Sequence, residues 1–288
     1  MPKVKTAKPK APKPTLGKDV LVNVILDRSG SMMGTAHGTI SGYNEYLNGL
    51  KADKATNYSI SLIQFDSPAD GPELTVSYVD KPLAEVPELT GTTYQPRGMT
   101  PLYDAVGECV RRVDAKGRLV ITVIITDGCE NASKEFSQSD VQALIKEKEQ
   151  NGWSFVFLAA NIDAKSVGAS MGMSSANTFN YSQGHEKTMY SNLAYATGTR
   201  SERVRSSGLR AASAMCFMTK EQEAAQMGGV SGTVTTTTTT TGPMPNNPYI
   251  QPTGGPQAGP STFPSSPADP PTKPTITWKE VSQSGSGS

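Results

Sequence analysis

The sequence predicts an α/β fold: a Rossmann-like, doubly wound, mostly parallel central sheet with one antiparallel edge strand and helices on both faces. Three observations support this prediction. Between residues 19 and 200, short continuous apolar runs alternate with segments whose apolar residues recur at helical spacing, as expected for strands covered by helices on both faces. Two of these runs end directly in polar clusters. One pair of runs is joined by a turn too short for a parallel crossover.

The first half of the pattern contains three strands and one helix. Val20–Leu26 is a continuous apolar run and a strand candidate. A helix is expected over residues 37–50, since the apolar residues there follow one helical face: Ile40, Tyr43, Leu47 and Leu50. Tyr58–Phe65 and Leu74–Val79 are the next two strands, and the proline- and glycine-containing turn between them favours an antiparallel pair.

The second half contains two long strands and several helices. Pro101 opens a helix with an apolar stripe that ends at Val113, and the buried strand Leu119–Ile125 follows. Ser137 and Asp140 resemble a capping box at the start of another helix. The remaining predicted elements are a strand at Trp153–Ala159, a short helix at Ala164–Met171, a short edge strand at Thr178–Tyr181 and a helix at His185–Thr197.

Composition divides the chain into four parts. Residues 1–18 hold six of the 27 basic residues and no acid, so we expect a disordered basic Lys/Pro-rich arm. The α/β domain spans residues 19–200, and residues 201–227 form a helical extension with a Thr-x-x-Gln cap at Thr219. Residues 228–288 contain 11 of the 21 prolines and are expected to be a disordered Thr/Pro/Gly/Ser-rich tail. Only Thr275–Val281 alternates like a strand there, which makes it a candidate docking peptide.

Charge and cysteine usage exclude several classes of protein. The chain is near neutral, with a formal net charge of +1, and no apolar run approaches the ~20 residues of a membrane helix. The three cysteines have neither disulfide-like nor zinc-like spacing. The beginning of the chain lacks the apolar stretch of a signal peptide. We therefore expect a cytoplasmic protein with reduced thiols and no contact with a membrane.

Polar residues follow the two most apolar strands at the point where each strand ends. Asp27, Ser29 and Ser31 come directly after the first strand, and Asp127 follows Leu119–Ile125. Thr100 precedes the helix that leads into the second of these strands. Ligands bind at the carboxyl ends of parallel strands where the strand order reverses. An all-oxygen set of carboxylates and hydroxyls suits Mg²⁺ and does not suit zinc or copper.

Each of these elements taken alone has a simpler interpretation. The first cluster is also compatible with a turn, and Thr100 with a helix cap before Pro101. Asp104, one helical turn after Thr100, either orients a ligand or a water or is a solvated acid favoured by the helix dipole. Glu130 is a further candidate for such a supporting role. The thiol of Cys129 lies near the metal loop and has no assigned role.

At these positions the chain resembles a von Willebrand factor type A domain. Asp27, Ser29 and Ser31 match the Asp-x-Ser-x-Ser element of the metal-ion-dependent adhesion site, Thr100 matches its separate threonine and Asp127 its distal aspartate. The segments around Thr100 and Asp127 resemble intracellular bacterial and phage members most closely. The resemblance implies that the two serines and sometimes the threonine bind Mg²⁺ or Mn²⁺ directly, that the two aspartates often act through water, and that a partner's acidic residue completes the coordination.

These features predict a metal-dependent protein-binding module rather than an enzyme. Its bound Mg²⁺ would accept a carboxylate from a partner protein. Two alternatives stay open at this point. One is a metal-dependent phosphoryl-transfer enzyme that uses Asp27, although the usual second aspartate is replaced by Ser29. The other is a nucleic-acid tether that uses the basic N-terminal arm. Four arginines between residues 200 and 210 are interpreted either as a contact for phosphate or an acidic partner or as part of a solvated connector.

Overall fold

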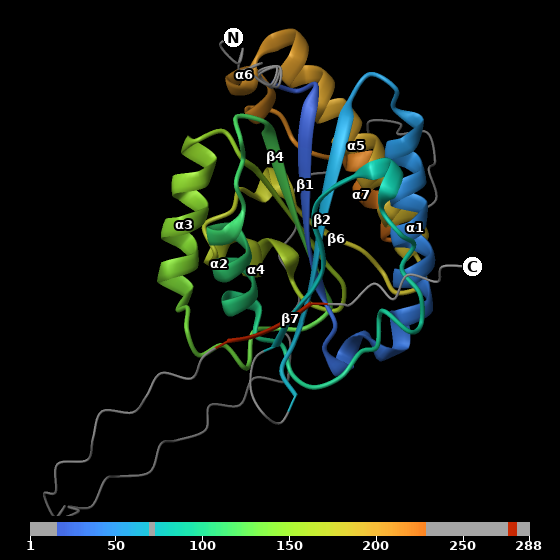
Figure 1. The fold of residues 1–288 in the computed structure, drawn as a ribbon, viewed down its shortest axis with the longest axis vertical. Helices are drawn as coiled ribbons and strands as arrows, with labels where there is room; N and C mark the ends of the chain where they lie inside the picture. Colours follow the sequence, from blue (N-terminus) through green and yellow to red (C-terminus); the bar gives the residue numbers. More distant parts are fainter. Residues whose placement is uncertain (1–15, 69–72, 229–275, 281–288) are drawn as a thin grey trace, which may run out of the picture. The chain divides into compact units, whose positions relative to one another are not determined.

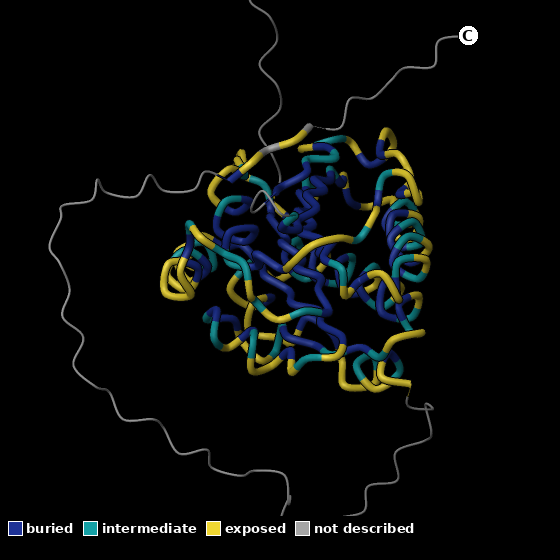
Figure 2. Tube along the Cα trace, turned by 90° about the horizontal axis from the view of Figure 1, so that it is seen from below, coloured by how far each residue is buried: buried dark blue, intermediate teal, exposed yellow. Residues whose placement is uncertain are grey.

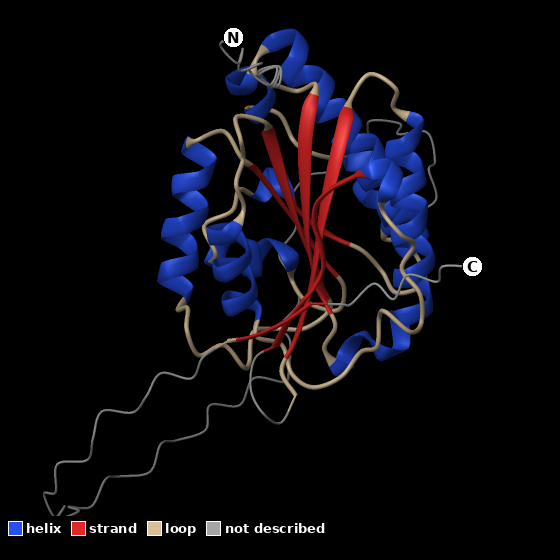
Figure 3. Ribbon diagram, viewed as in Figure 1, coloured by secondary structure: helices blue, strands red, loops and turns tan. Residues whose placement is uncertain are grey.

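A computed structural model describes residues 16–68, 73–228 and 276–280 of the chain. These residues contain a seven-stranded sheet in the order β6-β5-β4-β1-β2-β3-β7. The strands are red and the helices blue in Figure 3. The predicted basic arm, except residues 16–18, and the predicted tail, except residues 228 and 276–280, lie outside the described residues. The strands are β1 (Asp19–Asp27), β2 (Asn57–Asp66), β3 (Glu73–Pro82), β4 (Leu119–Thr126), β5 (Ser154–Ala159), β6 (Thr178–Asn180) and β7 (Thr277–Glu280).

Helices cover both faces of the sheet. One face carries α2 (Leu102–Arg112), α3 (Gln138–Gln150) and α4 (Ala164–Ser170), and the other carries α1 (Ala36–Ala52), α5 (Glu186–Ser207) and α7 (Lys220–Gln226) (Figure 1). The short helix α6 (Leu209–Ser213) follows α5, and 3-10 turns lie at Gly30–Thr35, Leu83–Glu85 and Ser175–Asn177. No helix among the described residues is long and apolar enough to cross a membrane.

The alternation of side chains along β1 explains the two cores. Val22 and Val24 join the cluster that packs against α1 and α5, whereas Leu21 and Ile25 join the cluster beneath α2 and α3. All four side chains are at most 2% exposed, and the strands form the buried centre of the domain (Figure 2). Strands buried on both faces have no solvent-facing positions, which is why they appear in the sequence as continuous apolar runs.

The predicted fold class is confirmed. β1 pairs in parallel with both β2 and β4, and β3 pairs antiparallel with β2. Both predicted capping boxes are present, at Ser137 with Asp140 and at Thr219 with Gln222. One addition was not predicted. β7 pairs in parallel with β3 and so extends the sheet beyond its antiparallel strand.

Two predicted helix boundaries are wrong. The helix that was expected to end at Thr197 continues to Ser207, because Ser201 and Val204 keep its buried face and the next residue with a positive φ is Gly208, at 80°. Pro101 caps α2 instead of forming its first turn, and its ψ of 65° is not helical. Neither difference moves the strands that position the candidate site.

The strand order reverses between β1 and β4. The chain passes from β1 outward to β2 on one side, and from β4 outward to β5 and β6 on the other. β1 and β4 are adjacent and parallel, with Leu26 opposite Ile125. Loops that leave the carboxyl ends of these two strands diverge to opposite faces and leave a crevice between them, the usual ligand position in open α/β sheets.

Candidate metal centre

The residues predicted to bind a metal meet at this reversal point. Asp27 is the last residue of β1, and Asp127 directly follows β4. Ser29 and Ser31 lie at the start of the 3-10 turn that leads into α1, and Thr100 lies two residues before α2. Asp27, Ser29, Thr100 and Asp127 are buried, while Ser31 is exposed.

Asp27 is the most enclosed of these side chains. Its carboxylate accepts a hydrogen bond from the backbone N–H of Ser29 at 2.6 Å and another from the hydroxyl of Thr126. Its backbone carbonyl accepts a hydrogen bond from the Tyr94 hydroxyl at 2.7 Å. Burial raises the pKa of Asp27 to about 6, although the hydrogen bonds from Thr126 and Ser29 oppose that shift. The carboxylate therefore has a fixed orientation and carries a charge that is costly without a nearby cation.

The hydroxyl groups gather around Gly128. The Oγ atoms of Ser29 and Ser31 are 3.0 Å apart. A Cβ atom placed on Gly128 would lie 2.9 Å from Thr100 Oγ1 and 3.3 Å from Ser31 Oγ. The serines of the first loop and the threonine of the α2 loop are thus brought together, and the missing side chain of Gly128 leaves the space between them.

Asp127 is a buried carboxylate whose oxygens have no hydrogen-bond partner among the described residues. Its side chain is only 4% exposed, and both carboxylate oxygens are buried without a hydrogen-bond donor among the described residues. Burial raises its pKa, and the nearby Ser31 hydroxyl opposes that shift without reversing it. A buried carboxylate with no donor is costly unless it is protonated or faces a cation. The donor set at this place therefore fits a hard divalent cation.

A divalent-cation site at this place would need hydroxyl ligands. Within the described parts of the chain, no three His, Cys, Asp or Glu side chains gather into a group that could hold a metal. The two aspartates alone are too few, so the serines and the threonine would have to complete the set. This composition agrees with a magnesium or manganese site and does not suit a structural zinc site.

Asp104 and Glu130 organise the loops around the site. Asp104 is fully buried, which rules out the solvated alternative, and accepts hydrogen bonds from the backbone N–H groups of residues 134, 135 and 136. Glu130 accepts hydrogen bonds from the N–H groups of Tyr103, Ala132 and Ser133 and from the Ser133 hydroxyl. Both carboxylates join the beginning of α2 to the loop after β4.

Sequence reasoning missed three residues that support the site. Thr126 and Tyr94 hold Asp27, as described above. The Asn131 side chain accepts a hydrogen bond from the backbone N–H of Thr100 at 2.8 Å, and the Asn131 backbone N–H donates to the Thr100 carbonyl at 3.1 Å. The only sequence signal was their position in or near the segments that carry the motif.

A buried ion cluster borders the site on the β2–β3 side. Arg28 and Arg97 both contact the carboxylates of Asp66 and Glu73, and Arg28 is 3.1 Å from Asp66 Oδ2. Lys279 of β7 lies 2.6 Å from Glu73 Oε2. Although burial opposes it, the hydrogen bond from Lys279 and the charges of the two arginines hold the pKa of Glu73 below its ordinary value. The backbones of Arg28 and Arg97 are also joined, by a 2.8 Å hydrogen bond.

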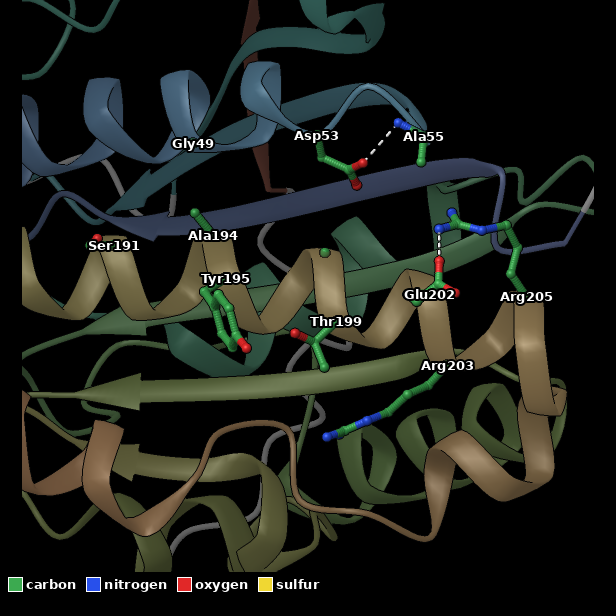
Figure 4. A pocket seen from close by; sticks show the side chains of 11 residues that line it. Gly49, Asp53, Ala55, Ser191, Ala194, Tyr195, Thr199, Glu202, Arg203 and Arg205 are labelled. Carbon is green, nitrogen blue, oxygen red and sulfur yellow. Dashed lines mark hydrogen bonds and ion pairs between the residues drawn. The ribbon is translucent and has the colours of Figure 1, made fainter.

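Two of the surface hollows of the described residues differ in their position relative to the candidate site. One, of about 490 Å³, adjoins the candidate site and is lined by residues 67, 68, 99 and 131–134. The other, of about 730 Å³, lies between α1 and α5, away from the metal loops (Figure 4). Gly49, Tyr195 and Glu202 are among the residues that line it.

The arginines between residues 200 and 210 mostly stabilise the C-terminal helices. Arg200 is 2% exposed, donates to the carbonyls of Ala212 and Met215 and stacks on Phe217. Arg205 donates to the Gly17 carbonyl. These two side chains are used inside the fold. Of the cysteines, Cys109 is buried, while Cys129 is exposed next to the candidate site.

Comparison with known proteins gives distant structural likenesses. No family model matches the chain, and neither does any curated protein. Proximal thread matrix protein 1 from the mussel byssus is similar over 59% of this chain and 46% of its own, at 12% identity and a TM-score of 0.42. The manganese-loaded Plasmodium vivax TRAP protein is similar over 50% of this chain and 58% of its own, at 18% identity and a TM-score of 0.34.

The described chain thus spans less than two thirds of each of these two proteins. It covers 96% of the vWF domain of the pilus tip protein Mfa5 from Porphyromonas gingivalis, which aligns with 66% of this chain at 10% identity and a TM-score of 0.41. The chain has the α/β fold of a von Willebrand factor type A domain, with β1 and β4 on the two sides of the point where the strand order reverses.

Proposed function

We propose that this chain is a protein-binding module that holds a divalent cation between Asp27, Ser29, Ser31, Thr100 and Asp127, and that a carboxylate of a partner protein binds there. The observation that carries the proposal is the Asp127 carboxylate, which is buried next to Gly128, where the hydroxyls of Ser31 and Thr100 gather, and has no hydrogen-bond partner for either oxygen among the described residues. Mg²⁺ is the proposed cation, with Mn²⁺ as its closest substitute.

The residues of the proposed site have different roles in binding the cation. Asp27 and Asp127 supply two negative charges, and the hydroxyl groups supply neutral oxygen ligands. Thr126 and the Ser29 N–H fix the orientation of Asp27, and Asn131 fixes Thr100. A bound cation would supply the positive charge that attracts a partner's carboxylate. The exposed Ser31 lies where the site meets solvent, so the partner would approach from this side.

Phosphoryl transfer through Asp27 is less well supported. A nucleophilic carboxylate needs an oxygen that can reach the substrate. Both oxygens of Asp27 accept hydrogen bonds, and the side chain has no exposed surface. We therefore propose binding without catalysis. The nucleic-acid alternative depends on residues 1–18, most of which lie outside the described residues, and it stays a prediction, as does the cytoplasmic location.

Calorimetric titration with Mg²⁺ and Mn²⁺ tests the cation. The full chain is expected to bind one ion, and Asp127→Asn is expected to weaken binding by at least tenfold, because the amide removes a negative charge from the donor set. Glu147→Gln is the matched control, since Glu147 is an exposed acid on α3. Equal binding by the wild type and Asp127→Asn, or no binding by the wild type, would contradict the proposal.

Capture of partners from native lysate tests the second half of the proposal. Wild type in Mg²⁺, wild type in EDTA and Asp127→Asn in Mg²⁺ are compared, after circular dichroism has shown that the variant is folded. A partner retained only by the first sample supports recognition through the cation. Partners that are identical in all three samples would show that the metal does not mediate binding.

A further inference from the structure

The C-terminal strand β7 occupies one end of the β3 edge. Thr277 pairs with Glu73 and Glu280 with Val76, in a parallel arrangement. The preceding residues of the chain, from 229 to 275, lie outside the described residues. β7 is thus a four-residue strand that reaches the sheet from a distant point in the sequence.

Two described side chains of this segment contact the rest of the domain. Ile276 is 9% exposed and belongs to the core cluster that includes Leu74. Lys279 pairs with Glu73 through a side chain that is 57% exposed. Surface ion pairs contribute little net stability, so Ile276 is the stronger of these two anchors.

The edge of β3 that β7 covers is suited to pairing with an extended segment. An edge strand presents unpaired N–H and C=O groups that accept another extended segment. β7 covers Glu73–Val76, whereas β3 continues to Pro82, and Val79 on the uncovered part is 61% exposed. Glu73 adds an acidic group at one end of the covered part. The edge therefore fits an extended segment with an apolar residue followed by a cation.

We propose that Glu73–Val76 of β3 are a strand-binding site, that residues 276–280 of the same chain are its built-in occupant, and that this occupant detaches while the rest of the sheet stays folded. The shortness of this strand and its position at the edge of the sheet support reversible release, because its ordered residues lose conformational freedom that a single row of four backbone pairs offsets only in part. The covalent connection supports rebinding within the chain, because a tethered segment has a high effective concentration.

Ion pairs link this strand to the loops of the candidate metal centre. Glu73 contacts Lys279 on one side and Arg28 and Arg97 on the other. Arg28 lies between Asp27 and Ser29 in the chain, and Arg97 lies three residues before Thr100. The occupant therefore places a positive charge at the ion cluster that borders the metal loops. The strand-binding proposal itself does not depend on metal binding.

Hydrogen exchange of the full chain in EDTA tests the proposal. Ile276→Asp removes the apolar anchor, Lys279→Glu places a like charge beside Glu73, and Lys273→Glu is the matched control with the same charge change outside β7. We expect amides of β3 within residues 74–76, which β7 covers, to exchange about tenfold faster in Ile276→Asp, less so in Lys279→Glu, and at the wild-type rate in the control. A synthetic peptide of residues 273–283 is expected to restore protection of β3 in Ile276→Asp.

Three results of the exchange experiment would overturn the proposal. In the wild type, amides of residues 277–280 should exchange well before those of β1 and β4. Equal protection of all these strands would make β7 a permanent part of the sheet. Unchanged β3 exchange in both variants would show that the segment does not occupy this edge. Protection that rises with protein concentration would identify the occupant as the segment of a second copy.

Discussion

Replacing Asp27 with asparagine should stabilise the metal-free protein. Burial raises the pKa of Asp27 from 3.8 to about 6. Because the folded state holds this proton more tightly than the unfolded state does, ionisation of Asp27 destabilises the fold. One pKa unit corresponds to about 1.4 kcal/mol, so the cost reaches about 3 kcal/mol once the pH is above 6. An amide at this position carries no charge and avoids that cost.

The local hydrogen bonds can adapt to the amide. The Ser29 N–H still has an oxygen to which it donates. The Thr126 hydroxyl, which now donates to Asp27, lies 3.1 Å from the Gly128 carbonyl and can donate there while it accepts from the amide. We therefore expect Asp27→Asn to keep most of the local structure. It should nevertheless lose cation binding, because the site loses one of its two negative charges.

Urea denaturation in EDTA measures the effect. The free energy of unfolding of the variant should exceed that of the wild type by up to about 3 kcal/mol at pH 7.5 and by about 1.5 kcal/mol at pH 5. The two should converge below about pH 3, where Asp27 is protonated in both the folded and the unfolded state. Saturating Mg²⁺ should stabilise only the wild type. A variant less stable than the wild type in EDTA at pH 7.5, or a gap that does not change with pH, would refute this reasoning. Glu147→Gln serves as the control.

Three further predictions concern neighbouring features. Gly128→Ala should weaken Mg²⁺ binding by about tenfold in calorimetry, since the new Cβ crowds the Thr100 hydroxyl; unchanged affinity would contradict the described geometry. Glu130→Ala should lower the free energy of unfolding by about 2–3 kcal/mol in urea denaturation, because three backbone N–H groups lose their acceptor. Burial raises the pKa of the Cys109 thiol. A thiol reagent should therefore modify the two exposed cysteines of the native protein and reach Cys109 only in denaturant. Rapid modification of all three thiols in the native protein would show that the face of the sheet covered by α2 opens.

The buried strands and their polar ends were predictable because they depend on local sequence. A strand covered on both faces is a continuous apolar run, and β1 and β4 therefore stood out. Polar residues directly after parallel strands share one edge of the sheet, so the sequence predicts that Asp27 and Asp127 lie close together. Two short-range signals, the capping boxes of α3 and α7, were confirmed for the same reason.

Long-range pairings were not predictable in this way. Thr126 donates to Asp27 across 99 positions of the chain, and Tyr94 across 67. A threonine at the end of an apolar strand and a tyrosine in a loop have no periodicity that reveals such partners. The alternation at residues 275–281 indicated an extended segment but not which edge it pairs with, because strand pairing depends on the whole sheet.

The hydrogen bonds that join α2 to the loop after β4 have a kinetic consequence. Asn131 holds Thr100, and Glu130 holds Tyr103, so the threonine and the loop that carries Asp127 form one preassembled part of the proposed cation site. A site whose ligands are already in place needs little conformational ordering on binding. Exchange of ions at this edge should then be governed by the loss of water from the incoming ion, and the far-UV circular dichroism of the protein should hardly change as the site fills.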